Sequence, residues 1–126
     1  KKQQKWQRVV VEACKQCGQN WIPEVGLPCS VEKFTKDASD QFRLIAAISD
    51  TARTLKATLL EWNEEHNERP ESATLLIGPE GDFTPAEISQ ALSAGFSPIS
   101  LGPIILRSET AAIYALSVTA YELMDR

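Results

Sequence analysis

A loop with the composition of a core is the feature that most restricts how this chain can fold. The segment from Ser100 to Ala111, S-L-G-P-I-I-L-R-S-E-T-A, contains three consecutive aliphatic residues. Gly102 and Pro103 before them are typical of a turn, and Ser108 after them is typical of a helix start. Loops of compact domains normally lie at the surface and are polar. We therefore expect this loop to be buried or to line a pocket.

A second segment, Leu75 to Phe83 (L-L-I-G-P-E-G-D-F), repeats the Gly-Pro pair after another apolar run. If both apolar runs are parallel strands, both loops follow the carboxyl end of a strand, which is the edge where open α/β sheets bind ligands. The polar side chains that the two loops offer are Glu80, Asp82, Arg107, Ser108, Glu109 and Thr110. The sequence therefore predicts a ligand site where the two loops meet.

Hydrophobic periodicity predicts alternating strands and helices along the chain. We expect strands over residues 42–48, 73–77 and 97–101, and helices over 3–17, 30–36, 54–65, 108–124 and between Thr84 and Gly95. Residues 21–29 contain two prolines and a glycine and are expected to form an irregular connector. The order indicates an α/β fold, with an open parallel sheet and helices on both of its faces.

The helix between Thr84 and Gly95 has the most complete boundary signals. Thr84 suits the N-cap, Pro85 the first helical position, Glu87 the capping box and Gly95 the C-terminal stop. The residues expected on its buried stripe are Ile88, Ala91 and Leu92. The first helix is expected to bury Trp6, Val9, Val10, Ala13 and Cys17, and the last helix Ile113, Leu116, Ala120 and Leu123.

Length and composition are those of a single globular domain. The chain has 126 residues, of which 43% are hydrophobic and 24% charged. It contains no run of about 18 apolar residues and no signal-peptide pattern, so we expect a soluble cytoplasmic protein without a membrane segment.

The charge is unevenly distributed. The net charge is −4, but the first helix carries Lys1, Lys2, Lys5, Arg8 and Lys15 against the single acidic residue Glu12. A basic helix on an acidic body can contact phosphates locally. A solvated helix face explains the same charges at least as well.

The cysteines do not indicate a disulfide framework or a metal site. Cys14 and Cys17 form a C-x-x-C pair late in a predicted helix, where the helix dipole does not favour a thiolate, so we expect packing thiols. Only Cys29 and His66 remain as further zinc ligands, and no metal is expected. Motifs for ATP or dinucleotide phosphates are absent, and the single histidine argues against histidine-dependent triads.

The two loop motifs together carry a family resemblance. L-I-G-P-E-G-D-F followed by S-L-G-P-I-I-L-R-S-E-T-A resembles the paired signature of the RsmE family. These are the uridine-N3 methyltransferases of small-subunit ribosomal RNA in the SPOUT superfamily. The upstream stretches R-V-V-V-E-A-C-K-Q-C-G-Q and I-P-E-V are also similar to the family. The resemblance covers essentially the whole chain.

The resemblance implies a particular architecture and set of partners. The α/β domain is expected to be of the SPOUT type with a C-terminal deep trefoil knot, and to form a homodimer that acts on small-subunit ribosomal RNA. Residues 1–20 are expected to be a linker-proximal helix and turn, and residues 21–126 the SPOUT methyltransferase domain. On the same resemblance, the family's N-terminal PUA-like barrel is expected to have no counterpart in residues 1–126.

The family's cofactor is S-adenosylmethionine, held in a bent form among the knot loops. Its contacts carry over by position to Leu76, Ile77, Gly78 and Gly81 in the first loop, and to Leu101, Gly102, Ile105 and Leu106 in the second. The aliphatic residues of the Ser100–Ala111 loop then become pocket lining.

Methylation of uridine N3 requires removal of a proton or stabilisation of charge on the flanking carbonyls. Arg107 is expected to hold negative charge or a phosphate, while Glu80 and Glu109 are candidates to accept the proton or to orient the base. Glu109 is equally explained as a first-turn carboxylate, and Glu80 as a turn residue. The expected RNA contacts are Arg8, Lys15 and Arg107.

Four positions depart from the family pattern. Asp82 stands where a second glycine is usual, and Ile104 replaces a common arginine. Gln19 stands where an arginine is frequent, and Ser108 replaces threonine conservatively. These changes affect RNA binding and the choice of substrate, so two alternatives stay open. One is methylation of a different RNA, and the other is a knotted, dimeric, RNA-associated module without turnover.

Overall fold

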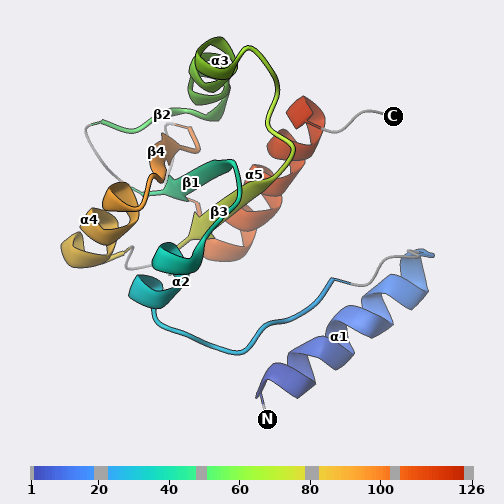
Figure 1. Cartoon of the computed structure of the whole chain (residues 1–126). Coiled ribbons are helices and arrows are strands. Elements are labelled where there is room, and N and C mark those ends of the chain that lie inside the picture. The colour runs from blue at the N-terminus through green and yellow to red at the C-terminus, as the bar shows by residue number, and fades with distance from the viewer. Residues whose placement is uncertain (1, 19–22, 48–50, 79–82, 103–105, 124–126) are drawn as a thin grey trace. The chain divides into compact units, whose positions relative to one another are not determined.

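The computed structural model describes residues 2–18, 23–47, 51–78, 83–102 and 106–123 (Figure 1). The chain divides into two compact units, Lys1–Ser30 and Val31–Arg126.

The first unit is a helix with an extended segment bound along it. Helix α1 spans Lys2–Cys17, and two of its glutamines one turn apart hold the segment. Gln3 Nε2 donates to Val25 O at 2.5 Å, and the Val25 N–H donates to Gln7 Oε1 at 2.6 Å. The predicted apolar stripe is wrong in part, because Trp6 and Val9 are 46% and 61% exposed. The helix uses amide side chains instead to satisfy the backbone of the segment.

The second unit contains the remaining elements in alternating order. They are α2 (Val31–Asp37), β1 (Phe42–Ala46), β2 (Arg53–Thr54), α3 (Leu55–His66), β3 (Ala73–Ile77), α4 (Pro85–Ser93), β4 (Ser97–Ser100) and α5 (Ser108–Leu123). Each strand and helix predicted in this region is present, with its bounds shifted by a few residues at most.

The described strands form one parallel sheet in the order β2-β4-β1-β3. In the register, Ala46 of β1 lies between Ile77 of β3 and Ile99 of β4. The predicted parallel sheet is confirmed. Strand β2 was not expected: its two residues are too few to show a period, and they are identified only by their pairing with Ile99 and Ser100.

Helices cover both faces of the sheet, as expected. On one face the core is built from β1, β4 and α3, with α5 packed against it, and its buried residues are Phe42, Leu44, Leu55, Leu59 and Ile99. On the other face Ile45 and Ala47 pack with Ala91 of α4 and with Phe96. Helices α2 and α4 contact each other, and Figure 1 shows α3 well away from both. Side chains that alternate along β1 therefore pack into two separate cores, one on each face of the sheet.

The capping signals of α4 are confirmed. Thr84 accepts from the Glu87 N–H at 3.2 Å, and Glu87 accepts from the Thr84 N–H at 2.9 Å. Leu92, expected in the stripe of α4, is 42% exposed. Helix α3 has a cap that was not predicted: Thr54 accepts from the Ala57 N–H at its start, and Asn67 closes its end in the left-handed conformation (φ 56°).

The predicted face of α5 is wrong in part: Leu123 packs against the core as expected, but Ile113 and Leu116 do not. Ala111 and Ala115 are buried, whereas Ile113 and Leu116 are 67% and 62% exposed. Because α5 is apolar around most of its circumference, periodicity could not separate the face that meets the sheet from the face that does not. The small side chains allow the helix backbone to approach the sheet closely.

Candidate functional site

The predicted site lies at the carboxyl edge of the sheet. Since Ala46 is paired with both Ile77 and Ile99, the strand ends on either side of β1 stop at the same level. Gly78 follows β3 directly, and Leu101 and Gly102 follow β4. Parallel strand topology therefore brings the starts of the two Gly-Pro loops to one edge.

A side-chain hydrogen bond connects the two loop regions. The hydroxyl of Ser108, the first residue of α5, donates to the Gly78 carbonyl oxygen at 2.7 Å. The loop after β4 leads directly into α5, so this bond fixes the far end of that loop to the end of β3. The expectation that the loops meet is confirmed for these two residues, although Ser108 itself was not named as a link.

Gly78 is restricted on its other side by an aromatic ring. A Cβ atom built on Gly78 would lie 3.0 Å from two ring atoms of Phe83. Phe83 is half-buried and packs against the core that contains Ala91 and Phe96. Contacts this short are rarely tolerated, so a side chain at position 78 would require the ring to move.

Gly102 plays a different part in the second loop. Its φ is +114°, a conformation that other residues rarely adopt, and a Cβ there would meet nothing within 4 Å. The Gly102 N–H donates to Ser100 Oγ at 3.3 Å, and the same hydroxyl donates to the Gly102 carbonyl at 3.2 Å. Glycine is therefore favoured at position 102 by the backbone conformation of the turn and not by a lack of space.

The residues expected to contact a cofactor fall into two groups. The first group is described by the structure: Leu76, Ile77, Gly78, Leu101 and Leu106 are half-buried, and Gly102 is exposed. Leu76 packs against the core beneath α4, and Leu101 against the core beneath α3 and α5. The expected contacts Gly81 and Ile105 lie outside the described residues.

Two of the predicted catalytic side chains flank Ser108. Arg107 and Glu109 are both exposed, and neither forms a hydrogen bond or an ion pair with another side chain in the described ranges. The Ala111 N–H donates to the Arg107 carbonyl at 2.7 Å, so Arg107 is the N-cap residue that directly precedes α5. The third candidate, Glu80, lies outside the described residues.

The two RNA-binding candidates of the first unit are exposed on α1. Lys15 Nζ lies 3.6 Å from a carboxylate oxygen of Glu12, and both side chains are largely in solvent. Such an exposed pair contributes little to stability, so Lys15 can exchange Glu12 for another anion. Arg8 is exposed on the same helix.

A groove beside α5 was missed by sequence reasoning. It has a volume of about 560 Å³ and lies between residues 69–73 and the α5 residues Leu116, Thr119, Ala120 and Leu123. Arg69 Nη2 closes one end by donating to the Glu122 carbonyl at 2.6 Å. The exposed apolar side chains of α5 alongside it include Ile113, Tyr114 and Tyr121. The excess of apolar residues on α5 was the only sequence signal for it.

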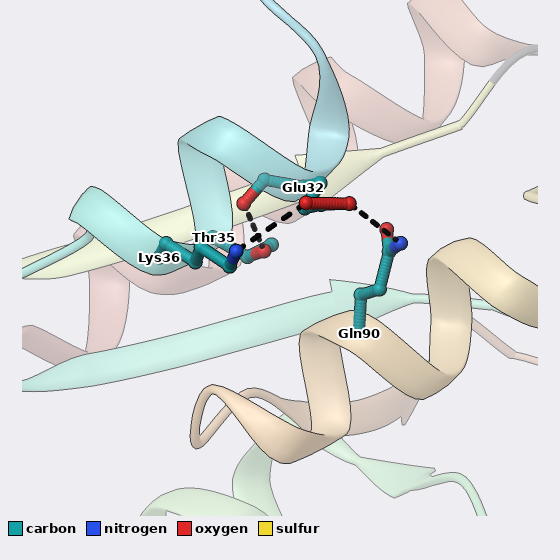
Figure 2. A network of polar contacts seen from close by, with 4 residues as sticks. All are labelled: Glu32, Thr35, Lys36 and Gln90. Atoms are coloured by element: carbon teal, nitrogen blue, oxygen red, sulfur yellow. Dashed lines mark hydrogen bonds and ion pairs between the residues drawn. The ribbon is translucent and has the colours of Figure 1, made fainter.

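A second groove of about 600 Å³ lies between α2 and α4. Figure 2 shows its polar network, in which Glu32 accepts from Lys36 Nζ at 3.3 Å and from Gln90 Nε2 at 3.4 Å. Only the Gln90 bond joins the two helices, because Lys36 and Glu32 both belong to α2, and this bond is long and exposed. Nothing in the sequence had indicated this pairing, because the partners lie 58 residues apart.

Potential metal ligands do not gather in the part of the chain that the structure describes: no group of three or more His, Cys, Asp or Glu side chains is placed to hold an ion. None of the helices in the described ranges has the length and apolar composition that a membrane crossing requires.

Comparison with known families gives one match, an RNA methyltransferase domain, over residues 1–120. Two similar proteins are named ribosomal RNA small subunit methyltransferase E. The one from Synechocystis is 36% identical over 92% of this chain and 37% of its own length. The one from Buchnera aphidicola subsp. Schizaphis graminum is 34% identical, and the match covers 99% of this chain and 48% of that protein. The chain thus spans less than half the length of these relatives.

Two solved structures are similar in fold and in sequence. A Legionella pneumophila protein described as a methyltransferase, in complex with SAM, superposes with a TM-score of 0.83 at 36% identity, covering 99% of this chain and 48% of that one. A ribosomal RNA small subunit methyltransferase E of Neisseria gonorrhoeae, bound to S-adenosyl methionine, superposes with a TM-score of 0.81 at 29% identity. The match covers 97% of this chain and 48% of that one.

Proposed function

This chain belongs to the RNA methyltransferase domain family, and from that premise we propose that it methylates N3 of a uridine in small-subunit ribosomal RNA with S-adenosylmethionine as the methyl donor. The observation that carries the proposal is the hydrogen bond between Ser108 and Gly78, which joins the two predicted cofactor loops at the sheet edge. The relatives' names and the SAM-bound neighbours support the same donor and substrate.

The residues at this edge suit a nucleoside cofactor. Half-buried aliphatic side chains, including Ile77, Leu101 and Leu106, offer apolar surface to an adenine ring. A Cβ on Gly102 would meet nothing within 4 Å, so a ligand can approach the backbone of that turn closely. We assign Leu76, Ile77, Gly78, Gly81, Leu101, Gly102, Ile105 and Leu106 to the cofactor site.

When bound, S-adenosylmethionine supplies an electrophilic methyl group on a sulfonium ion. The protein's own residues must prepare the nucleophile, because uridine N3 carries a proton that is lost on methylation. Arg107 holds the negative charge that develops on the flanking carbonyls, and its exposure at the start of α5 leaves it free to do so. Glu109, one residue beyond Ser108, and Glu80 are the candidate proton acceptors.

The proposed RNA contacts extend beyond the reacting base. Arg8 and Lys15 on α1 bind phosphates, because both are exposed on a helix rich in basic residues. These contacts position the RNA without selecting a sequence. The reaction takes place in the cytoplasm, where the ribosomal subunit is assembled.

The finer architecture is also part of the proposal. The domain is a SPOUT methyltransferase whose C-terminal segment forms a deep trefoil knot. Two copies associate through the exposed apolar side of α5, where Ile113 and Leu116 are mostly in solvent and Leu116 lines the groove beside residues 69–73. Burial of this surface in a dimer explains why α5 carries more apolar residues than its own core uses.

Two experiments test the proposal. In cells that lack the protein, mass spectrometry of ribosomal RNA nucleosides should show loss of 3-methyluridine from the small subunit. An unchanged profile, together with calorimetric binding of S-adenosylmethionine, would favour a different RNA substrate. If neither the cofactor nor its demethylated product bound, a module without turnover would be the better description.

A substitution separates catalysis from binding. Arg107→Ala should lower the methylation rate about 100-fold, because one charge-stabilising group is lost from the transition state. Cofactor affinity should change little. Lys36→Ala is a suitable control, since Lys36 is exposed on α2, which leads into the amino end of β1 at the opposite edge of the sheet.

A further inference from the structure

We propose that Ser108 is a positioning residue whose hydroxyl holds the start of α5, and with it Arg107, against Gly78 at the end of β3. The 2.7 Å hydrogen bond spans 30 residues of sequence and is partly buried. The proposal rests on the function proposed above, because it assigns Ser108 to the geometry of that site.

The hydroxyl of Ser108 serves no purpose within its own helix. A serine at a helix start ordinarily caps it, accepting from a backbone N–H two or three residues further on. Here the first intrahelical bond runs from the Ala111 N–H to the Arg107 carbonyl, which places Ser108 at the first helical position, after the cap. Its side chain donates out of the helix, to Gly78.

The acceptor is equally well placed for a positioning role. Gly78 is the first residue after β3, and the ring of Phe83 occupies the space where its side chain would be. Held by the ring on one side and by the hydroxyl at its carbonyl, the residue has little freedom to move. The bond therefore fixes the proposed cofactor edge and the proposed catalytic arginine relative to each other.

Three variants test this role. Ser108→Ala removes the hydroxyl, and Ser108→Thr keeps it. Thr58→Val is the matched control, because Thr58 also donates its hydroxyl to a backbone carbonyl, that of Thr54 at 2.9 Å, but within α3. Each variant is compared with the unchanged chain for S-adenosylmethionine affinity by calorimetry, methylation of small-subunit ribosomal RNA, amide hydrogen exchange at Ile77 and Gly78, and the urea midpoint.

We expect Ser108→Ala to weaken cofactor binding about 3- to 10-fold, the loss of one partly buried hydrogen bond. The methylation rate at saturating cofactor should fall as well, since Arg107 is no longer held, and exchange at Ile77 and Gly78 should rise. Ser108→Thr should restore each quantity to within about twofold of the unchanged chain. Thr58→Val should leave affinity and rate unchanged even if it lowers the urea midpoint.

The proposal is overturned if Ser108→Ala binds cofactor and methylates like the unchanged chain, or if its losses match those of Thr58→Val. It is also overturned if Ser108→Thr fails to restore affinity. Failure of the underlying function has a different signature, because the unchanged chain would then neither bind S-adenosylmethionine nor methylate the RNA. Even in that case, unaltered exchange at Gly78 in Ser108→Ala would contradict the positioning role.

Discussion

The two loops begin with the same Gly-Pro pair and differ in what their glycines do. Gly78 lies against the ring of Phe83, so it is glycine because no space remains for a side chain. Gly102 has open space around it but a φ of +114°, so it is glycine because of its backbone conformation. The same motif therefore encodes close packing in one loop and a turn in the other.

This difference has a functional side. The first loop is held by tertiary contacts, namely the Phe83 ring and the Ser108 hydroxyl. The second is held at its start by local bonds between Ser100 and Gly102. Substitutions at Gly78 should therefore disturb the fold and the site together, whereas those at the start of the second loop, at Ser100 and Gly102, should act locally.

The largest expected effect comes from Gly78→Val. Its Cβ would already be 3.0 Å from the Phe83 ring, and two further carbons would add to the overlap. We expect the free energy of unfolding to fall by about 2–3 kcal/mol, as in other overpacked sites. Urea unfolding followed by tryptophan fluorescence measures it, and a loss below that of Gly102→Val would reverse the assignment of the two glycines.

Gly102→Ala should have a smaller effect, because the cost is backbone strain without a clash. A residue with a Cβ at this φ loses about 1–2 kcal/mol. The same urea titration applies, with Gly26→Ala as a control in the first unit, where a Cβ meets nothing within 4 Å and no positive φ is present. Equal stability of the Gly102 and Gly26 variants would show that the turn relaxes freely.

A double-mutant cycle with Phe83→Leu sharpens the contrast. A smaller side chain at position 83 should reduce the overlap that Gly78→Ala creates, and so reduce its loss of stability. We expect a coupling energy of about 1 kcal/mol between the two substitutions. The same change should be additive with Gly102→Ala to within about 0.5 kcal/mol, since no contact joins that position to the ring. Coupling of similar size in both cycles would mean that the two loops respond as one structure.

The smallest effect is expected for Ser100→Ala. The two hydrogen bonds lost to Gly102 are exposed and 3.2–3.3 Å long, so water can replace them at a cost of at most about 0.5 kcal/mol. Calorimetry with S-adenosylmethionine should show affinity within about twofold of the unchanged chain. A loss as large as that expected for Ser108→Ala would place Ser100 among the residues that hold the cofactor edge.

The sequence prediction was most accurate where several local signals agreed. Thr84 and Glu87 specify the start of α4 through short-range hydrogen bonds, and the structure has both. The parallel sheet followed from apolar runs separated by helices. Strand β2 escaped prediction because Arg53 and Thr54 are identified as a strand only by their pairing with β4.

The candidate site could be predicted in position but not in its connections. The topology implied that the ends of β3 and β4 share an edge, yet the bond between Ser108 and Gly78 depends on where α5 begins in space. The prediction of the buried face of α5 was wrong in part for a related reason. Ala115 is preferred over Leu116 at the sheet because the space is narrow, a property of the assembled layers that the residue pattern does not contain.

The place of β1 at the centre of the sheet has a consequence for synthesis. Both of its ladder partners, β3 and β4, are made after it, and α5 is made last. Since translation proceeds from the amino end, a nascent chain carries Leu44 and Ile45 without their neighbours until nearly the whole unit has left the ribosome. A chain paused before α5 is complete is therefore the form most in need of a chaperone.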